Sequence, residues 1–459
     1  MHDRDVLCEA IAAFSTILDA PSFDPEMPLP PLLAQRRPLT LTALTSIASM
    51  SDSKIDTSEA VAYVVIQHNW PQILNWMKYF CHEVTTAVSK PDSFDSVIRM
   101  ISSVISKVGH DKVLFERAVL EDSLLNLIIR AWLKSNDSPS LDTAHRYMLL
   151  GSLCKALGTL DGERQISDVR EMILREAKGD AGVVTKRLTR QLKNPAKGCK
   201  ENHLAVFYTV GIIDCLAIED RARLSPSAFM DNFLKDDLVV IVTQLLVFFS
   251  QDIARPRQRR IIPVDSCSSP VQYCLQVLGC CGRSRNGPHW VAVMMKNGFL
   301  RAIAGLVAFP QHMRSGKGSV IDLLLDRDIP QHFCHRFVVL AAIKAIKEVT
   351  ENGSARNFES SCIKDSWRNF ESILLDRTVF NAIYERDFAE GDILQCLYCH
   401  KNKRETQLFK CAGCKTTVYC SKECQTASWK TGDHKVQCKL LHDAWYKARR
   451  PILVYFSAF

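Results

Sequence analysis

The sequence lacks a long uninterrupted apolar run. Its longest one, Leu238–Phe249, has twelve residues and is broken by Thr243 and Gln244, whereas a helix that crosses a bilayer needs about 20. We expect a buried helix there and no membrane contact. The first residues, MHDRDVLCEAIAAF, are acidic where a secretion signal is basic. These absences predict an intracellular protein, in the cytoplasm or the nucleus, where clustered cysteines bind metals more often than they form disulfides.

Common catalytic motifs are also missing. The sequence has no glycine-rich phosphate loop, no G-x-S-x-G and no H-E-x-x-H, so we expect no enzyme. A strong charge of one sign is lacking too, because 58 basic and 50 acidic residues leave a net charge of +8. Direct nucleic-acid binding is therefore not expected. Two basic stretches, at 186–200 and 255–260, are interpreted as solvated loops, with a nuclear localisation signal as the alternative.

Runs of alternating strand character are absent, and helical periodicity fills residues 1–390. Segments such as SVIRMISSVISKV, SLLNLIIRAWL and FVVLAAIKAIKEV place apolar residues at intervals of three and four. The segment QVLGCCGRSRNGPHWVAVMMKNGFLRAIAGLVAF resembles an armadillo repeat. Because no fixed period aligns several copies, the sequence predicts an all-α region that is either an armadillo-like helical solenoid or an irregular helical domain.

Proline is concentrated in one place. Residues 21–40 contain six prolines, and proline at this density favours an extended linker over a helix.

Cysteine is sparse up to residue 395 and dense after it. The scattered thiols, including the adjacent pair Cys280 and Cys281, are predicted to be core or surface residues without a metal. Seven of the 18 cysteines fall between residues 396 and 438. With one histidine, their order is Cys396-x2-Cys399-x11-Cys411-x2-Cys414-x5-Cys420-x3-Cys424-x9-His434-x3-Cys438. Structural zinc takes four sulfur or nitrogen ligands, so eight ligands predict two closed zinc sites in a small C-terminal module.

This order of ligand pairs, with VYCSKECQ and a Trp before the His, resembles the MYND-type zinc finger. The resemblance covers residues 396–438 and leaves 439–459 as a partly helical C-terminal tail. It implies a cross-braced pairing: one zinc on Cys396, Cys399, Cys420 and Cys424, and the other on Cys411, Cys414, His434 and Cys438. It also implies that Gln425 and Trp429 contact proline-rich peptides. The chain's own PLPPLL, Pro28 to Leu33, is then a candidate ligand for this groove, within one chain or between two copies. Tyr419 and Phe409 are interpreted as structural, and His400 and His442 as non-ligands.

The resemblance implies a zinc-binding interaction or scaffold protein that binds protein partners through proline-rich segments. A protein-lysine methyltransferase is an alternative, because MYND fingers also occur within SET-domain enzymes. Against it, only 21 residues follow Cys438, whereas those enzymes place most of the catalytic domain after the finger. A nuclear transcription regulator is the other alternative.

Overall fold

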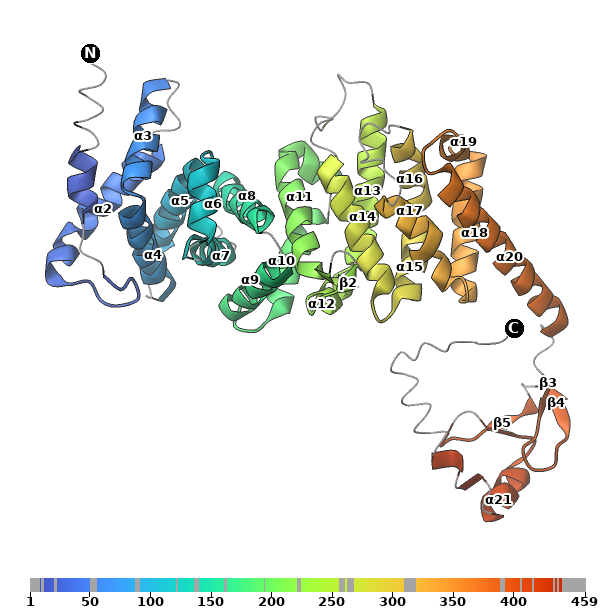
Figure 1. Cartoon of the computed structure of the whole chain (residues 1–459). Coiled ribbons are helices and arrows are strands. Elements are labelled where there is room, and N and C mark those ends of the chain that lie inside the picture. Colours follow the sequence, from blue (N-terminus) through green and yellow to red (C-terminus); the bar gives the residue numbers. More distant parts are fainter. Residues whose placement is uncertain are drawn as a thin grey trace. The chain divides into compact units, whose positions relative to one another are not determined.

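The computed structural model describes residues 9 and 12–439 apart from short gaps (Figure 1). The gaps are 20–22, 50–55, 87–90, 121–122, 136–139, 161–162, 194, 221–223, 256–260, 262–267, 309–318, 389–392, 405–406, 415–416, 432–433 and 436. The tail at 440–459 and most of the basic stretch 255–260 therefore lie outside the described residues. The chain divides into two compact units: residues 1–329 with 341–367, and residues 330–340 with 368–459. The predicted domain limits stay predictions.

The first unit is built almost entirely of helices, as the sequence predicts. Their bounds are α2 Pro31–Ser49, α3 Asp56–His68, α4 Trp70–Thr86, α5 Pro91–Val108, α6 Lys112–Leu120, α7 Ser123–Ser135, α8 Thr143–Thr159, α9 Glu163–Glu176, α10 Ala181–Leu192, α11 Pro195–Ala217, α12 Met230–Lys235, α13 Leu238–Ala254, α14 Ser268–Arg283, α15 Gly287–Lys296, α16 Phe299–Val307, α17 Val320–Leu323 and α19 Ala355–Glu359. A two-stranded antiparallel ribbon, β1 Ile218–Asp220 and β2 Ser225–Pro226, interrupts them. Helices α18, Arg336–Glu351, and α20, Lys364–Phe388, each begin in one unit and end in the other.

Helices of this unit pack against helices three places away in the chain. One series runs α2, α5, α8, α11, α14 and α17, and another runs α10, α13, α16 and α19, each helix contacting the next (Figure 1). Side-chain hydrogen bonds recur at matching separations of 44 to 47 residues: Gln67 to Asp111, Arg37 to Glu83, Arg130 to Glu176, Arg283 to Asp328 and Arg301 to Glu348. Stacked repeats of about this length give this recurrence. The armadillo-like class itself stays a prediction.

Two glycines let consecutive helices of the first series approach closely. A Cβ on Gly151 of α8 would lie 2.7 Å from Cε2 of Tyr208 on α11. One on Gly211 of α11 would lie 3.0 Å from Sγ of Cys154 and 3.3 Å from Cε2 of Tyr273 on α14. At two successive helix interfaces, α8–α11 and α11–α14, a glycine therefore lies against a tyrosine ring.

Cations from neighbouring helices bind the last carbonyls of two helices in the series. Lys107 of α5 is buried and donates to the carbonyl of Ile47 at 2.6 Å and to that of Ala48, both at the end of α2. Lys155 of α8 donates to the carbonyl of Gly109, just after α5. Carbonyls at a helix C-terminus lack partners inside the helix and carry partial negative charge, so both contacts stabilise a helix end.

The prediction of an extended linker at 21–40 is wrong for its second half. Helix α2 begins at Pro31, where a fixed φ suits the first helical position, and continues through Pro38. An interior proline costs about 3 kcal/mol, but burial of Leu33, Leu44 and Ile47 contributes roughly 1.5–3 kcal/mol each. Because Leu33 is buried in a helix, Pro28–Leu33 does not form the extended peptide ligand that the sequence suggested.

The prediction of a solvated loop at 186–200 is wrong, because nearly all of these residues lie in α10 and α11. Two further predictions for this unit are confirmed. Residues 238–249 lie in α13, most of whose side chains are buried, and Cys280 and Cys281 are fully buried. Burial raises the pKa of the Cys281 thiol to about 12, which leaves it unreactive. Among the described residues no single helix is long and apolar enough to cross a membrane, although the bent pair α15 and α16 passes on length and composition.

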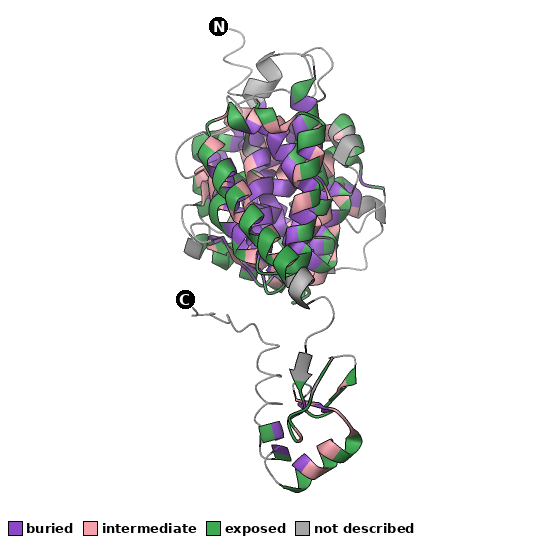
Figure 2. Cartoon of the chain, turned by 90° about the vertical axis from the view of Figure 1, so that its right-hand side faces the viewer, coloured by how far each residue is buried: buried purple, intermediate pink, exposed green. Residues whose placement is uncertain are grey.

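The second unit contains the cysteine-rich module. Strands β3, Ile393–Gln395, and β4, Asn402–Arg404, form one antiparallel hairpin, with Leu394 opposite Lys403. Strands β5, Phe409–Lys410, and β6, Val418–Tyr419, form a second, with Phe409 opposite Tyr419. Helix α21, Lys422–Lys430, follows. In Figure 2 buried residues crowd the helical part, whereas few lie in this small module.

Candidate zinc centre

The eight predicted ligands gather into two groups. Cys396, Cys399, Cys420 and Cys424 form the first, and Cys411, Cys414, His434 and Cys438 form the second. Within each group all ligand atoms lie within 4.8 Å of one another. The pairs interleave along the chain, so the pairing is the cross-braced one that the resemblance implied.

Tight turns and one helix bring the first group together. The Cys396–Cys399 pair follows β3, in a turn closed by the His400 amide donating to the Cys396 carbonyl at 3.0 Å. Cys420 directly follows β6. Cys424 lies in the first turn of α21, where the Ser421 hydroxyl accepts from the Cys424 amide at 3.3 Å and caps the helix.

The second group is more deeply buried, and His434 is fully so. The turn between Cys411 and Cys414 contains Gly413, where a Cβ would lie 2.9 Å from the Cys438 sulfur. Gly413 is thus a packing requirement that the ligand spacing did not reveal. The sequence CAGC shows that this turn contains a glycine. It does not show which residue of the turn lies against the fourth ligand of the group, Cys438.

The distances within the groups fit tetrahedral metal ions. Zinc–sulfur bonds of about 2.3 Å place the sulfurs of one tetrahedron about 3.8 Å apart. The sulfurs of Cys411 and Cys438 lie 3.8 Å apart, and Cys420 lies 3.4 Å from both Cys399 and Cys424. The His434 Nε2 atom lies 3.3 Å from the Cys411 sulfur and 3.9 Å from that of Cys414. A disulfide needs about 2.05 Å, so these are ligand sets for zinc.

The pKa values of two thiols in the first group also favour a bound cation. Burial opposes ionisation of Cys396, but amide N–H groups of Cys399, Cys420 and Tyr398 lower its pKa to about 6. The neighbouring sulfurs of Cys399 and Cys424 raise the pKa of Cys420 to about 12. The protein groups alone thus favour the thiolate form of Cys396 and oppose that of Cys420. A dication supplies the missing charge, and the residues fit two zinc ions per chain.

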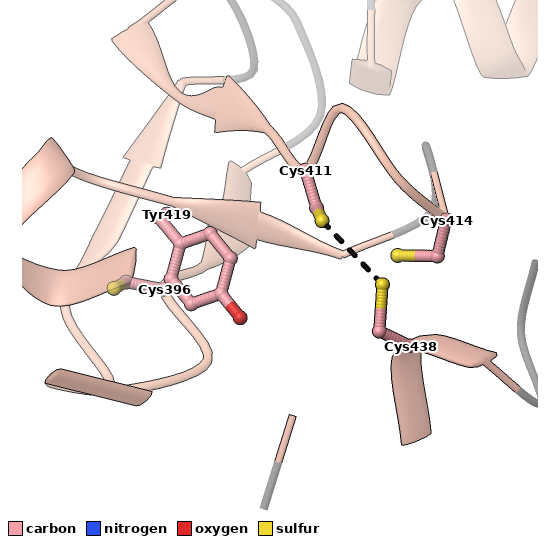
Figure 3. Packing of buried hydrophobic residues seen from close by; sticks show 5 residues of the cluster. All are labelled: Cys396, Cys411, Cys414, Tyr419 and Cys438. Atoms are coloured by element: carbon pink, nitrogen blue, oxygen red, sulfur yellow. Dashed lines mark hydrogen bonds between the residues drawn. The ribbon is translucent and has the colours of Figure 1, made fainter. Parts of the chain in front are cut away.

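Tyr419 lies between the two groups and is fully buried (Figure 3). Its hydroxyl donates to Ser428 of α21 at 3.3 Å, and its ring meets His434 edge to face at 5.6 Å. The structural interpretation of Tyr419 is therefore confirmed. Phe409 is different: it is 56% exposed, because strand β5 is two residues long and nothing among the described residues covers its outer side. The exposed His400 is in neither ligand group, and His442 lies outside the described residues.

Gln425 and Trp429 lie four residues apart on α21, which places them on one face of the helix. Gln425 is half-buried and directly follows the ligand Cys424. Trp429 is 43% exposed, and its ring lies edge to face with His434 at 5.8 Å. The indole thus contacts the second ligand group while 43% of the side chain stays exposed.

Comparison with known proteins assigns this module to a family. The family model of the MYND finger matches residues 396–438, so the module is a MYND zinc finger, which is a protein-interaction module. Three curated relatives share short stretches: Ubiquitin carboxyl-terminal hydrolase 19 of Arabidopsis thaliana, 42% identical over 60 residues; and, from Caenorhabditis elegans, SET domain-containing protein 14, 39% over 67 residues, and Hypoxia-inducible factor prolyl hydroxylase, 47% over 49 residues.

These stretches cover 13%, 15% and 11% of this chain, and only 8%, 14% and 6% of the relatives. The similarity is thus on the scale of the 43-residue finger. The activities in the relatives' names belong to proteins of which this chain matches a small part.

Proposed function

We propose that this chain is a non-enzymatic scaffold protein whose finger docks short proline-rich peptides at Gln425 and Trp429. The supporting observation is the 43% exposed indole of Trp429, which contacts His434 of the second zinc group and lies on the same face of α21 as Gln425. The seven thiols of the finger remain zinc ligands only under reducing conditions, which favours an intracellular site of action.

The chemistry of this face suits proline. An indole is a large, flat, amphipathic surface, and proline rings in a polyproline II segment stack on such surfaces at little entropic cost. The Gln425 amide has donors and an acceptor for the peptide backbone, which is fully solvated in polyproline II. Because α21 is anchored by Cys424 and capped by Ser421, the face is preorganised.

A structural role for zinc follows from the ligand count. Each group supplies four protein ligands, so neither ion keeps an open position for water or substrate. The long helical region would then present partners over stacked repeats, as helical solenoids do.

Isothermal titration of the full chain with a proline-rich peptide tests the proposal. We expect Trp429→Ala and Gln425→Ala each to weaken binding at least tenfold. Phe409→Ala, which removes another exposed aromatic of the finger, should leave binding unchanged. All variants should keep two zinc ions. If Trp429→Ala binds like the wild type with its zinc intact, the groove assignment is wrong.

The similarity to SET domain-containing protein 14 favours one second candidate, a protein-lysine methyltransferase. Incubating the purified chain with S-adenosylmethionine and histone peptides distinguishes the two. We expect no methyl transfer above that of heat-denatured protein, and transfer that exceeds this background would replace the scaffold proposal.

A further inference from the structure

The second half of α20 carries an apolar stripe that nothing in the described structure covers. Leu375, Val379, Phe380 and Ile383 are 64%, 49%, 63% and 42% exposed. We call these four residues the α20 stripe. Val379 and Ile383 follow Leu375 at four-residue intervals, so the three lie along one face.

The stripe is distinct from the face by which α20 packs. Trp367, Phe370 and Leu374 of α20 are buried. The Trp367 ring stacks on Phe358 with centroids 3.9 Å apart, and the Phe370 ring meets Phe333 at 5.4 Å. A helix that ends a stack normally has a polar outer face. Helix α20 has a second apolar face besides the one that packs against the rest of the chain. This predicts that another segment binds to the second face.

We propose that the occupant is residues 440–459 of the same chain, docking through the apolar part of that segment on the α20 stripe. The sequence Pro451–Phe459, PILVYFSAF, has no charged side chain, and its only polar side-chain groups are the hydroxyls of Tyr455 and Ser457. This proposal is independent of peptide binding at Trp429.

Charge also favours this pairing. Residues 375–388 contain three acidic side chains and two basic ones, a net charge of −1. Residues 440–459 contain three basic side chains (Lys447, Arg449 and Arg450) and one acidic one (Asp443), a net charge of +2. The C-terminus of α20 adds partial negative charge from its last carbonyls. The basic residues precede the apolar ones, so both attractions can act together.

The connection is short enough. Four residues separate the end of α20 at Phe388 from the start of β3 at Ile393. A 43-residue module is about 25 Å across, and the eleven residues between Lys439 and Pro451 extend to about 40 Å. The segment can therefore return to α20 past the finger.

A tethered segment explains the size of the stripe better than a second copy does. Four such side chains expose apolar area on the order of 400 Å², whereas a stable complex of two separate proteins buries about 800 Å² on each partner. Tethering raises the effective concentration to the millimolar range, so a small contact suffices. Docking would anchor the finger at both ends, through α20 and through residues 440–459.

Limited trypsin digestion of the full chain, followed by intact mass, tests this docking. Docking should protect the bonds after Lys447 and Arg449. The double variant Val379→Asp with Ile383→Asp should speed this cleavage at least fivefold. Both positions are exposed, so the helical circular dichroism should not change. The matched control is Val113→Asp on α6, where Val113 is 76% exposed, and its cleavage rate should equal that of the wild type.

Equal cleavage rates in the wild type and the double variant would overturn the proposal. Protection that disappears on dilution, together with a dimer mass in light scattering, would assign the stripe to a second copy instead. A photo-crosslinking residue at position 379 gives a second readout. We expect crosslinks to residues 440–459 within monomers, and crosslinks only elsewhere or only between chains would equally overturn the proposal.

Discussion

At the scale of single residues, close helix packing depends on positions where no side chain fits. A methyl group at Gly151 would lie 2.7 Å from the Tyr208 ring, and overpacking of this kind costs about 1–3 kcal/mol. The higher helix propensity of alanine offsets at most about 1 kcal/mol of this cost. We therefore predict that Gly151→Ala lowers the stability of the helical region by about 1–2 kcal/mol, measured by urea unfolding followed by circular dichroism.

The same helix offers the control. A Cβ at Gly158 of α8 would meet nothing within 4 Å, so Gly158→Ala keeps only the propensity gain and should stabilise the protein by about 0.5 kcal/mol. Equal effects of the two substitutions would show that the Gly151–Tyr208 contact does not limit the packing of α8 on α11.

At the scale of elements, helix ends are held by cations from the next helix in the series. Lys107→Met keeps most of the side-chain volume but leaves the carbonyls of Ile47 and Ala48 without their charged donor. Losing such a hydrogen bond costs about 1–3 kcal/mol. We predict faster hydrogen–deuterium exchange in the last turns of α2, with exchange in α13 unchanged.

The control for this prediction is Lys112→Met on α6. The Lys112 side chain is 82% exposed and pairs with Glu116 at 3.7 Å, and such surface pairs contribute less than about 1 kcal/mol. Exchange in α2 should then match that of the wild type. If Lys107→Met also leaves α2 unchanged, its ammonium group does not stabilise the end of that helix.

At the scale of the whole molecule, two kinds of core stabilise the two parts. The helical region buries apolar side chains, whereas the finger buries chiefly metal ligands around Tyr419. We predict two zinc ions per chain by elemental analysis. Chelation should unfold the finger and leave the helical circular dichroism nearly intact, because the binding energy of structural zinc is the folding energy of such a module.

A cysteine substitution tests, without a chelator, whether zinc stabilises the finger and not the helical region. Cys411→Ser should lower the zinc content to one ion or none while the helices remain. Cys362→Ser, which removes an exposed free thiol, should keep both ions. A large loss of helical signal after chelation would mean that zinc also supports the helical region.

The sequence determined the zinc centre almost completely. The spacing from Cys396 to Cys438 specified the ligands and their number, because the two cysteines of a short pair such as C-x2-C are close enough in the chain to bind the same ion. The buried helix at 238–249 followed equally from the local pattern. The linker prediction at 21–40 failed because proline content is a local signal, and the burial of Leu33, Leu44 and Ile47 against other helices outweighs it.

Only the tertiary structure decided the features that depend on residues far apart in the chain. The separation of 44 to 47 residues between paired side chains, such as Arg283 and Asp328, is invisible in the sequence because only the packing of helices brings residues so far apart in the chain together. Gly413 and the α20 stripe show the same limit. A glycine next to the sulfur of a distant residue and an apolar helix face that no described residue covers are both defined by their surroundings in space, and only folding brings those surroundings together.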